Sequence, residues 1–256
     1  AALAIQRALA DLNRKNVATG KPELAARIGI ETGPVVVDAA GAWARLVGQM
    51  AQAEIPIEPV RHQLFITEPI GGIEAEQPIL RIIDTAVYIR PARGGLMLGG
   101  FEPDPLPVDL EVMDPLFSMD DVPLDSQVLD KLTSTVEGQV PVLRSTDRRE
   151  HRGGLFTMTP DGRFLVGPVP GVHGLWSATG CNGSGFSSSP AIGLLLAEWI
   201  TEGKPSIDLR ILQPERFASR HLTIEQLRAA GISQYAHYYD PTASQPGPME
   251  AESFRA

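Results

Sequence analysis

The feature that most constrains the fold is a glycine-rich loop between an apolar strand and an apolar helix, within residues 159–202. A strand over 174–179 runs directly into a loop with three glycines, and a helix is predicted from about Ser188 until Gly203 stops it. Glycines at such a junction let the backbone approach a ligand closely, with free N–H groups and the positive helix end directed at it. The alternative is a strand-to-helix turn whose glycines serve packing alone.

This stretch begins with Pro160-Asp161-Gly162, which predicts a tight turn between two short strands. The whole order of TPDG turn, GLWSATG strand, glycine-rich loop and helix resembles the last cofactor-contacting part of the D-amino-acid oxidase superfamily of flavoproteins. That superfamily includes glycine oxidase and the sarcosine and dimethylglycine dehydrogenases. The resemblance implies that FAD is the cofactor. It also implies cofactor contacts from Gly180, Asn182, Gly183, Gly185 and Phe186.

A second motif, VVVDAAGAWA at 35–44, resembles the pattern VV-x-A-A-G-A-W of the same superfamily, in which a buried strand ends against the cofactor. The resemblance implies that Ala40, Gly41 and Trp43 contact FAD, mainly through backbone. The superfamily's N-terminal βαβ unit with Gly-x-Gly-x-x-Gly, which holds the ADP half of FAD, has no counterpart before residue 180. We therefore expect an α/β chain with α+β character, in which an incomplete FAD-binding domain accompanies a mixed, largely antiparallel substrate-domain sheet with flanking helices.

The first 37 residues resemble a different family. A segment ending in LNRKN, followed by ARIGIETGPVVV, is similar to the middle of a class III adenylate/guanylate cyclase catalytic domain. That family's metal-binding aspartates and its Asn-x-x-x-Arg pair have no counterpart here, so cyclase activity is not expected. We expect a cyclase-like helix-hairpin fragment at 1–37, a flavoprotein C-terminal half at 35–217 and a partly disordered extension at 218–256. The two resemblances overlap on VVVDAAG, which indicates a fusion or an assembly artefact.

Periodicity and turn residues predict further elements between these motifs. The predicted strands are 55–68, a hairpin of 86–90 and 96–101 around Gly94-Gly95, and a short strand at 140–143, followed by a charged DRREHR loop. The predicted helices are 1–16, 125–137 with Asp125 as its N-cap, and one that a Thr223/Gln226 capping box opens and Gly231 closes.

Three side chains are candidates for chemistry. His62 lies in PVRHQLFITE and Tyr88 in DTAVYIR, and both strings resemble segments of the dimethylglycine and sarcosine group. The resemblance implies that His62 assists amine deprotonation and that Tyr88 faces the substrate. For each, ordinary sheet packing is an equally good reading. Arg90, on the same strand face as Tyr88, could bind a substrate carboxylate, although a solvated surface arginine is the stronger alternative.

Composition narrows the function classes. A formal net charge of −9 argues against nucleic acid or an anionic membrane as a partner, and no apolar run reaches the roughly 18 residues of a membrane helix. Cys181 is the only cysteine, so no internal disulfide forms, which fits a reducing cytoplasmic location. The histidines are scattered singly without metal-ligand spacing, so no metal site is predicted.

Two functions remain open after the sequence is read. The first is an FAD-dependent oxidoreductase, which the resemblance implies is truncated. It passes a hydride from a small N-methyl amine such as sarcosine or dimethylglycine to flavin N5, with an unidentified electron acceptor. The second is a non-catalytic fusion or remnant that cannot retain FAD, because half of the dinucleotide site has no counterpart in the sequence.

Overall fold

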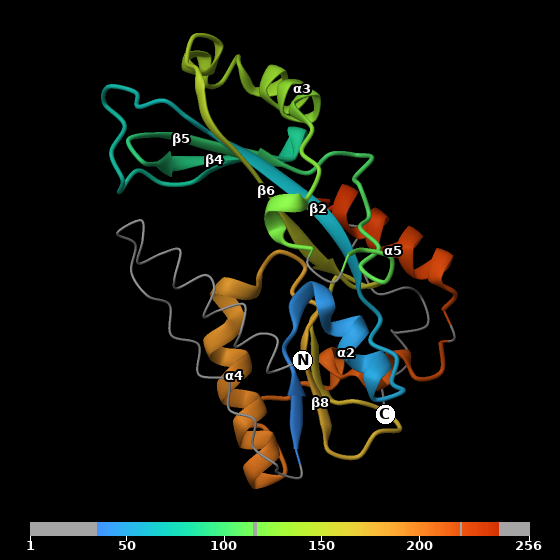
Figure 1. Ribbon diagram of the computed structural model, residues 1–256. Coiled ribbons are helices and arrows are strands. Elements are labelled where there is room, and N and C mark those ends of the chain that lie inside the picture. The colour runs from blue at the N-terminus through green and yellow to red at the C-terminus, as the bar shows by residue number, and fades with distance from the viewer. Residues whose placement is uncertain (1–34, 115–116, 221, 241–256) are drawn as a thin grey trace, which may run out of the picture. The chain divides into compact units, whose positions relative to one another are not determined.

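A computed structural model describes residues 35–114, 117–220 and 222–240. The chain divides into two compact units, 1–36 and 37–256, and almost every described element belongs to the second. The helix expected at 1–16, most of the hairpin at 26–37 and the end of the extension lie outside the described residues. The elements below are therefore those of the second unit, together with the strand that begins at Val36 (Figure 1).

The larger sheet has five strands in the order β3-β4-β5-β2-β6, and all its neighbours pair antiparallel. The strands are β2 Glu58–Thr67, β3 Leu80–Ile82, β4 Val87–Ala92, β5 Gly95–Gly100 and β6 Arg148–Met158. The expected strand over 55–68 and the expected hairpin are confirmed. Arg93 and Gly94, both at positive φ, turn β4 into β5, and this backbone conformation is the one that two-residue hairpins favour.

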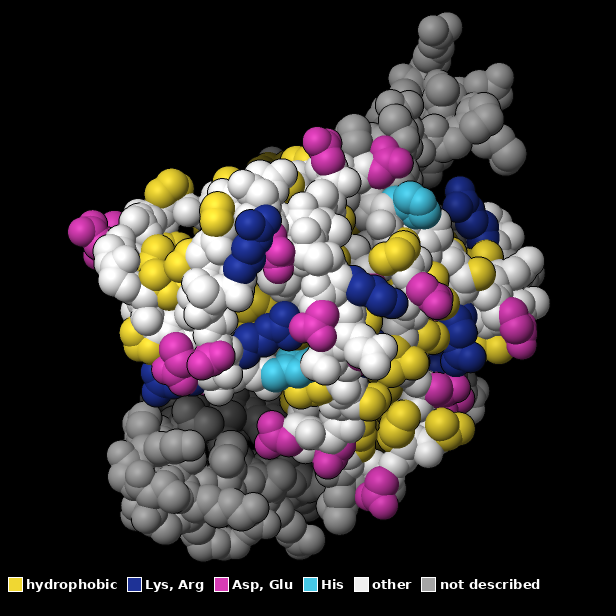
Figure 2. Space-filling model, turned by 90° about the horizontal axis from the view of Figure 1, so that it is seen from above, with side chains coloured by type: hydrophobic (Ala, Val, Ile, Leu, Met, Phe, Trp, Pro, Cys, Tyr) yellow, Lys and Arg dark blue, Asp and Glu magenta, His cyan; other side chains and the backbone are white. Residues whose placement is uncertain are grey.

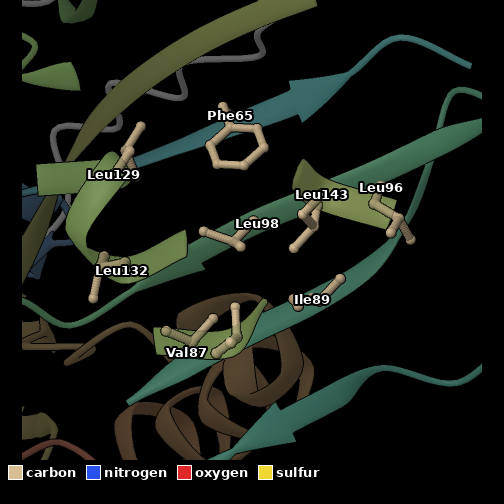
Figure 3. Close-up of a cluster of buried hydrophobic side chains, with 9 residues drawn as sticks. Phe65, Val87, Ile89, Leu96, Leu98, Leu129, Leu132 and Leu143 are labelled. Carbon is tan, nitrogen blue, oxygen red and sulfur yellow. The ribbon is translucent and has the colours of Figure 1, made fainter. Parts of the chain in front are cut away.

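Helix α3, Ser126–Val136, covers one face of this sheet and forms its main hydrophobic core. Asp125 caps the helix as expected, because its carboxylate accepts the Gln127 N–H at 2.9 Å. Figure 3 shows Leu129 and Leu132 of α3 directed towards the sheet residues. The buried members of this core are Phe65, Val87, Ile89, Leu96, Leu98, Leu129, Leu132, Val136 and Leu143.

The smaller sheet has three strands in the order β1-β8-β7, with β1 Val36–Asp38, β7 Leu165–Pro168 and β8 Leu175–Thr179. Helix α4, Gly185–Glu202, packs on β7 and β8, and α2, Ala44–Met50, follows β1 (Figure 1). Gly203 at φ 81° ends α4, as expected. Thus the strand, glycine loop and helix predicted at the outset are confirmed, with the helix starting three residues earlier.

Strand β2 is buried along almost its whole length, although half of its residues are polar. The last helix, α5 Ile224–Ala236, packs on β2 and β6. The buried polar residues of β2 are Glu58, Arg61, His62, Gln63 and Thr67. Each makes a hydrogen bond to another element, because a buried polar group without a partner loses the hydrogen bonds that water would supply.

Several expected local structures are wrong. Residues 141–144 form a 3-10 turn rather than a strand, because Pro141 cannot donate to a ladder and instead opens the turn. The charged DRREHR segment is not a loop but the start of β6, whose place at the sheet edge leaves its arginines in solvent. The strands on either side of Pro160-Asp161-Gly162 do not pair as a hairpin, since β6 and β7 belong to different sheets.

The end of α5 also differs from expectation. Its Thr223/Gln226 capping box is present, but the helix continues through Gly231 to Ala236. A side chain at 231 would bring its Cβ within 2.7 Å of the Glu58 Cβ, so this glycine serves close helix–strand packing rather than helix termination. Within the expected extension, α5 therefore packs closely on β2 and β6.

Glu58 anchors an ion cluster that reaches from the buried strand β2 to the surface. Its fully buried carboxylate lies 3.4 Å from an Arg45 nitrogen and 3.1 Å from Arg228 Nε. Arg45 also lies 3.6 Å from Asp109 and 3.1 Å from Glu111. Burial raises the pKa of Glu58, and the Arg228 and Arg45 charges oppose that rise. The cluster joins α2, β2 and α5 to the segment around residue 110.

We predict that Arg45→Ala lowers the free energy of unfolding by about 3 kcal/mol, because it leaves part of the Glu58 charge buried without compensation. Urea denaturation followed by circular dichroism measures the change. Arg210→Ala is the matched control: it breaks an ion pair with Asp208 whose side chains are 82% and 58% exposed, and should change little. Equal losses in both variants would contradict a stabilising role for the buried cluster.

Candidate active site

A cavity of about 220 Å³ opens beside the face of the larger sheet opposite α3. Along β4, Val87 and Ile89 point into the core under α3, whereas Tyr88 and Arg90 lie on the cavity side, as strand alternation requires. The prediction that Tyr88 and Arg90 share a face is confirmed. The cavity lining consists of Ile79, Arg81, Tyr88, Arg90, Phe101, Phe156, Gly183, Tyr238 and Tyr239.

His62 lies behind this lining rather than within it. Its ring is 5% exposed, and its Nε2 lies 2.8 Å from the Tyr88 hydroxyl. Its Nδ1 lies 2.7 Å from the hydroxyl of Tyr235, which is fully buried on α5. The structure therefore brings the two predicted residues His62 and Tyr88 into direct contact, and the hydrogen bond between them links His62 to the cavity lining.

Aromatic rings enclose His62. Phe156 of β6 stacks on it with ring centroids 4.2 Å apart, and Phe101 follows at 5.1 Å. Phe101 in turn stacks on Tyr238 at 4.1 Å. These rings exclude water from the imidazole, so burial lowers the pKa of His62 to about 4. Burial likewise raises the pKa of the Tyr88 phenol above its ordinary range, while the charge of Arg90 opposes that rise.

Two guanidinium groups give the cavity a positive character. Arg81 stands opposite Tyr88 in the β3–β4 pairing, and Arg90 is two residues further along β4 on the same face. Arg81 also lies over the Tyr239 ring, 5.9 Å from its centroid. None of the described lining residues is acidic. Such a cavity favours an anionic group of the substrate.

The glycine-rich loop reaches the cavity through Gly183. A Cβ at Gly183 would lie 2.6 Å from the Phe156 ring, so the loop packs closely on the ring that covers His62. Gly180, at φ 65°, has similarly little room, because its Cβ would lie 2.5 Å from Thr159. The Asn182 side chain points inward to hydrogen bonds with Thr159 and Gly180. Asn182 thus holds the loop in shape and offers no free side-chain group at the surface.

Helix α4 begins where this loop ends. A Cβ at Gly185 would lie 2.9 Å from Cys181, so Gly185 allows the tight entry into the helix. No side chain caps the first turn, because the hydroxyl of the N-cap Ser184 lies 3.0 Å from the Tyr238 hydroxyl. Phe186 is 99% exposed. The first amide groups of an 18-residue helix therefore remain available to an anion or a carbonyl oxygen.

The Ala-Ala-Gly turn follows β1. Asp38 is 2% exposed and accepts the Ala40 N–H at 3.0 Å, which fixes the chain as it leaves the strand. Burial raises the pKa of Asp38 to about 6. Gly41 has a φ of 58° with nothing within 4 Å of its would-be Cβ, and its carbonyl accepts the Thr179 hydroxyl, which ties the turn to β8. Trp43 remains 37% exposed.

Sequence reasoning missed several cavity residues. Arg81 has no motif around it, and only its pairing opposite Tyr88 reveals its place. Tyr238 and Tyr239 line the cavity and Tyr235 lies behind it, and the aromatic-rich string YAHYY is the available sequence signal for them. The cavity lining therefore includes residues of the expected extension at 218–256, whose boundary stays a prediction.

Three further observations concern what the described residues could bind. They contain no group of three or more His, Cys, Asp or Glu residues arranged to hold a metal ion. Among the described helices, none combines the length and apolar character needed to cross a membrane. On the face that Figure 2 shows, basic and acidic side chains are interspersed, without a continuous basic stripe. None of these observations tests whether the chain binds nucleic acid or a membrane, so the expectation that it binds neither stays a prediction.

We predict that His62 makes the protein less stable as the pH falls. The folded imidazole titrates near 4 and the unfolded one near 6.5, so only the unfolded state binds a proton in between. The contribution of neutral His62 to the free energy of unfolding is complete above pH 6.5, and about 3 kcal/mol of it is lost by pH 4. Urea denaturation between pH 7.5 and 4.5 should give a flatter profile for His62→Gln than for the wild type. His237→Gln, at an exposed position, should keep the wild-type slope; an unchanged slope in His62→Gln would contradict the assignment.

Comparison with known proteins supports the resemblance. The family model "FAD dependent oxidoreductase" (DAO) matches residues 3–199. Human mitochondrial dimethylglycine dehydrogenase is 34% identical over 193 residues, which cover 71% of this chain and 22% of the relative. Human mitochondrial sarcosine dehydrogenase is 31% identical over 232 residues, covering 87% of this chain and 24% of the relative. This chain thus spans about a quarter of these relatives' length.

The fold comparison agrees. The crystal structure of L-proline dehydrogenase from P. horikoshii superposes with a TM-score of 0.61 and 26% identity, covering 74% of this chain and 48% of that chain. The family match starts at residue 3, so it also spans the segment that resembles a cyclase, and the cyclase-like fragment stays an expectation without support here. The cytoplasmic location likewise stays a prediction, since both human relatives are named as mitochondrial. Because the family model matches well over half of this chain, the chain belongs to the DAO family of FAD-dependent oxidoreductases.

Proposed function

We propose that this chain forms the substrate cavity and the flavin-facing wall of an amine oxidoreductase that oxidises an N-methyl amino acid of the sarcosine or dimethylglycine type. The observation that carries the proposal is the cavity itself, in which two arginines and a phenol bonded to an imidazole face aromatic walls. The names of the two human relatives point to the same substrate class.

The arginines supply the substrate's anchor. Arg90 lines the cavity and donates to the carbonyl of Pro91 at 3.1 Å, which leaves the rest of its guanidinium for another acceptor. Arg81 provides a second guanidinium from the neighbouring strand. A carboxylate can accept charge-assisted hydrogen bonds from both. The same two positive charges disfavour an ammonium group, so the cavity selects the neutral amine, which is the form that can give up a hydride.

Tyr88 orients the amine, and His62 supports it. With a pKa of about 4, His62 would hold a proton at pH 7 only at a cost of about 4 kcal/mol. We therefore assign His62 the role of hydrogen-bond partner to Tyr88 rather than that of a base that keeps the substrate's proton. The Tyr88 hydroxyl, on the cavity side, can bond the N–H of a secondary amine or the carboxylate. Phe101, Phe156 and Tyr239 surround N-methyl groups and exclude water.

The residues at the glycine loop fit the flavin side of FAD. Gly41 has open space beside its backbone, Gly183 borders the cavity, and the first turn of α4 is uncapped. These backbone groups, together with Ala40 and Gly180, would hold the cofactor. When bound there, FAD supplies the acceptor for the substrate's hydride. Trp43 and Phe186 are exposed and could cover it, whereas Asn182 and Gly185 would act only by shaping the loop.

The second candidate function is a non-catalytic remnant or fusion that cannot retain FAD. The observation that favours it is the lack of a Gly-x-Gly-x-x-Gly motif in the sequence, which leaves the ADP half of the cofactor without its usual phosphate-binding turn. The proposed truncation rests on the sequence alone, because it follows from the missing motif. The same holds for the segment boundaries, which are 1–37, 35–217 and 218–256. The two candidates differ in whether the chain takes up FAD.

We expect the purified chain to take up FAD and to bleach on substrate. The measurement is a titration of FAD into the protein with flavin absorbance and fluorescence, followed by anaerobic addition of sarcosine or dimethylglycine and loss of the oxidised flavin band. Weak retention is expected because the phosphate-binding turn is lacking, so FAD is supplied in excess. Protein that stays colourless under these conditions would favour the remnant.

Two variants should separate binding from orientation. Arg90→Gln should raise the substrate concentration for half-maximal flavin reduction by roughly 10- to 100-fold, because a charge-assisted bond is lost. Tyr88→Phe should instead lower the limiting rate by roughly tenfold and leave that concentration little changed. Arg210→Gln, with its exposed side chain, serves as the control. The roles are contradicted if both variants change only the FAD content.

A further inference from the structure

A chain of hydrogen bonds leads from the cavity into the protein. It runs from the Tyr88 hydroxyl to His62 Nε2 at 2.8 Å, from His62 Nδ1 to the Tyr235 hydroxyl at 2.7 Å, and from that hydroxyl to the Gly100 carbonyl at 3.5 Å. Tyr235 is fully buried and lies on α5, beyond residue 199 where the family match ends. Tyr235 does not line the cavity; its ring packs near Phe101 and Phe156, and its hydroxyl is linked to the cavity through His62.

The chain can run in one direction at a time. A neutral imidazole carries one N–H, so it donates at one nitrogen and accepts at the other. If Nδ1 carries the proton, Tyr88 donates to Nε2, Nδ1 donates to Tyr235, and Tyr235 donates to Gly100. If Nε2 carries the proton, Tyr235 donates to Nδ1 and the Tyr88 proton must point elsewhere. The geometry admits both directions, and the surroundings decide between them.

Two features favour the inward direction. The Gly100 carbonyl lies at the inner end of the chain and gives the buried Tyr235 proton an acceptor. At the outer end, Arg81 and Arg90 line the cavity without an acidic residue among the described lining. Their positive charges turn the Tyr88 O–H dipole so that its proton points away from them, towards His62, and its lone pairs face the cavity.

We propose that Tyr235 is a positioning residue that holds His62 in the Nδ1–H tautomer, so that the Tyr88 oxygen presents lone pairs to the cavity. Tyr88 then accepts a hydrogen bond from the N–H of a secondary amine such as sarcosine, a bond that a neutral tertiary amine cannot form. This last consequence rests on the proposed amine substrate, whereas the tautomer itself does not. No proton is transferred in this arrangement, because the three groups keep their own protons and only the direction of the bonds is set.

The experiment reads the tautomer by NMR on the full chain labelled with ¹⁵N-histidine, without FAD. Long-range ¹H–¹⁵N correlations show which ring nitrogen carries the proton, and His62→Gln assigns the signals by their loss. We expect Nδ1–H in the wild type at pH 7. In Tyr235→Phe, Nδ1 loses its acceptor, and the proton should move to Nε2, where Tyr88 can still accept it.

Two further variants make the result decisive. Tyr238→Phe removes a hydroxyl from the same aromatic cluster that bonds Ser184 rather than His62, and should keep the Nδ1–H tautomer. Tyr88→Phe should also keep it, because Tyr235 remains, and this variant serves if Tyr235→Phe does not fold. An Nε2–H tautomer in the wild type, no change in Tyr235→Phe or a switch in Tyr88→Phe would each overturn the proposal. Failure of the proposed function is read separately, from the FAD titration.

Discussion

The structure depends on one constraint: a central strand that is buried on both faces carries polar side chains, and each of them takes at least one hydrogen-bond partner from another part of the chain. Glu58, Arg61, His62, Gln63 and Thr67 of β2 each draw in a different part of the chain. Leaving any of these groups buried without a partner costs about 1–3 kcal/mol, and more for a charge. The positions of α2, α5 and the segments near residues 102 and 125 are therefore coupled to a single strand.

The candidate site is a direct product of that constraint. His62 is one of the buried polar groups, and both of its ring nitrogens are occupied by phenols from other elements. The rings that keep it dry also form the cavity wall, and Gly183 packs on one of them, Phe156. Core packing, substrate cavity and cofactor loop thus meet at one imidazole, although the sequence places their residues far apart.

Much of this could be predicted wherever a local signal exists. Short segments of sequence carry the signals for the strand around His62, the β4–β5 hairpin, the Asp125 cap and the glycine loop. The shared face of Tyr88 and Arg90 follows from strand alternation alone. Sequence reasoning failed where the environment is set by distant partners. Nothing local marks Arg81 as the neighbour of Tyr88, and the charges of DRREHR hide an edge strand. Gly231 reads as a helix stop until the strand beneath it is known.

The pairing of Tyr88 with Gly99 has an evolutionary consequence. A Cβ at position 99 would lie 2.3 Å from the Tyr88 hydroxyl oxygen, so the phenol occupies space that only glycine leaves free. The two positions are therefore coupled: a larger residue at 99 requires the phenol to move away from its present place or to be absent. We expect a glycine at 99 wherever the tyrosine keeps this position. The residue at position 99 should therefore indicate whether the tyrosine is in this place, although position 99 does not line the cavity.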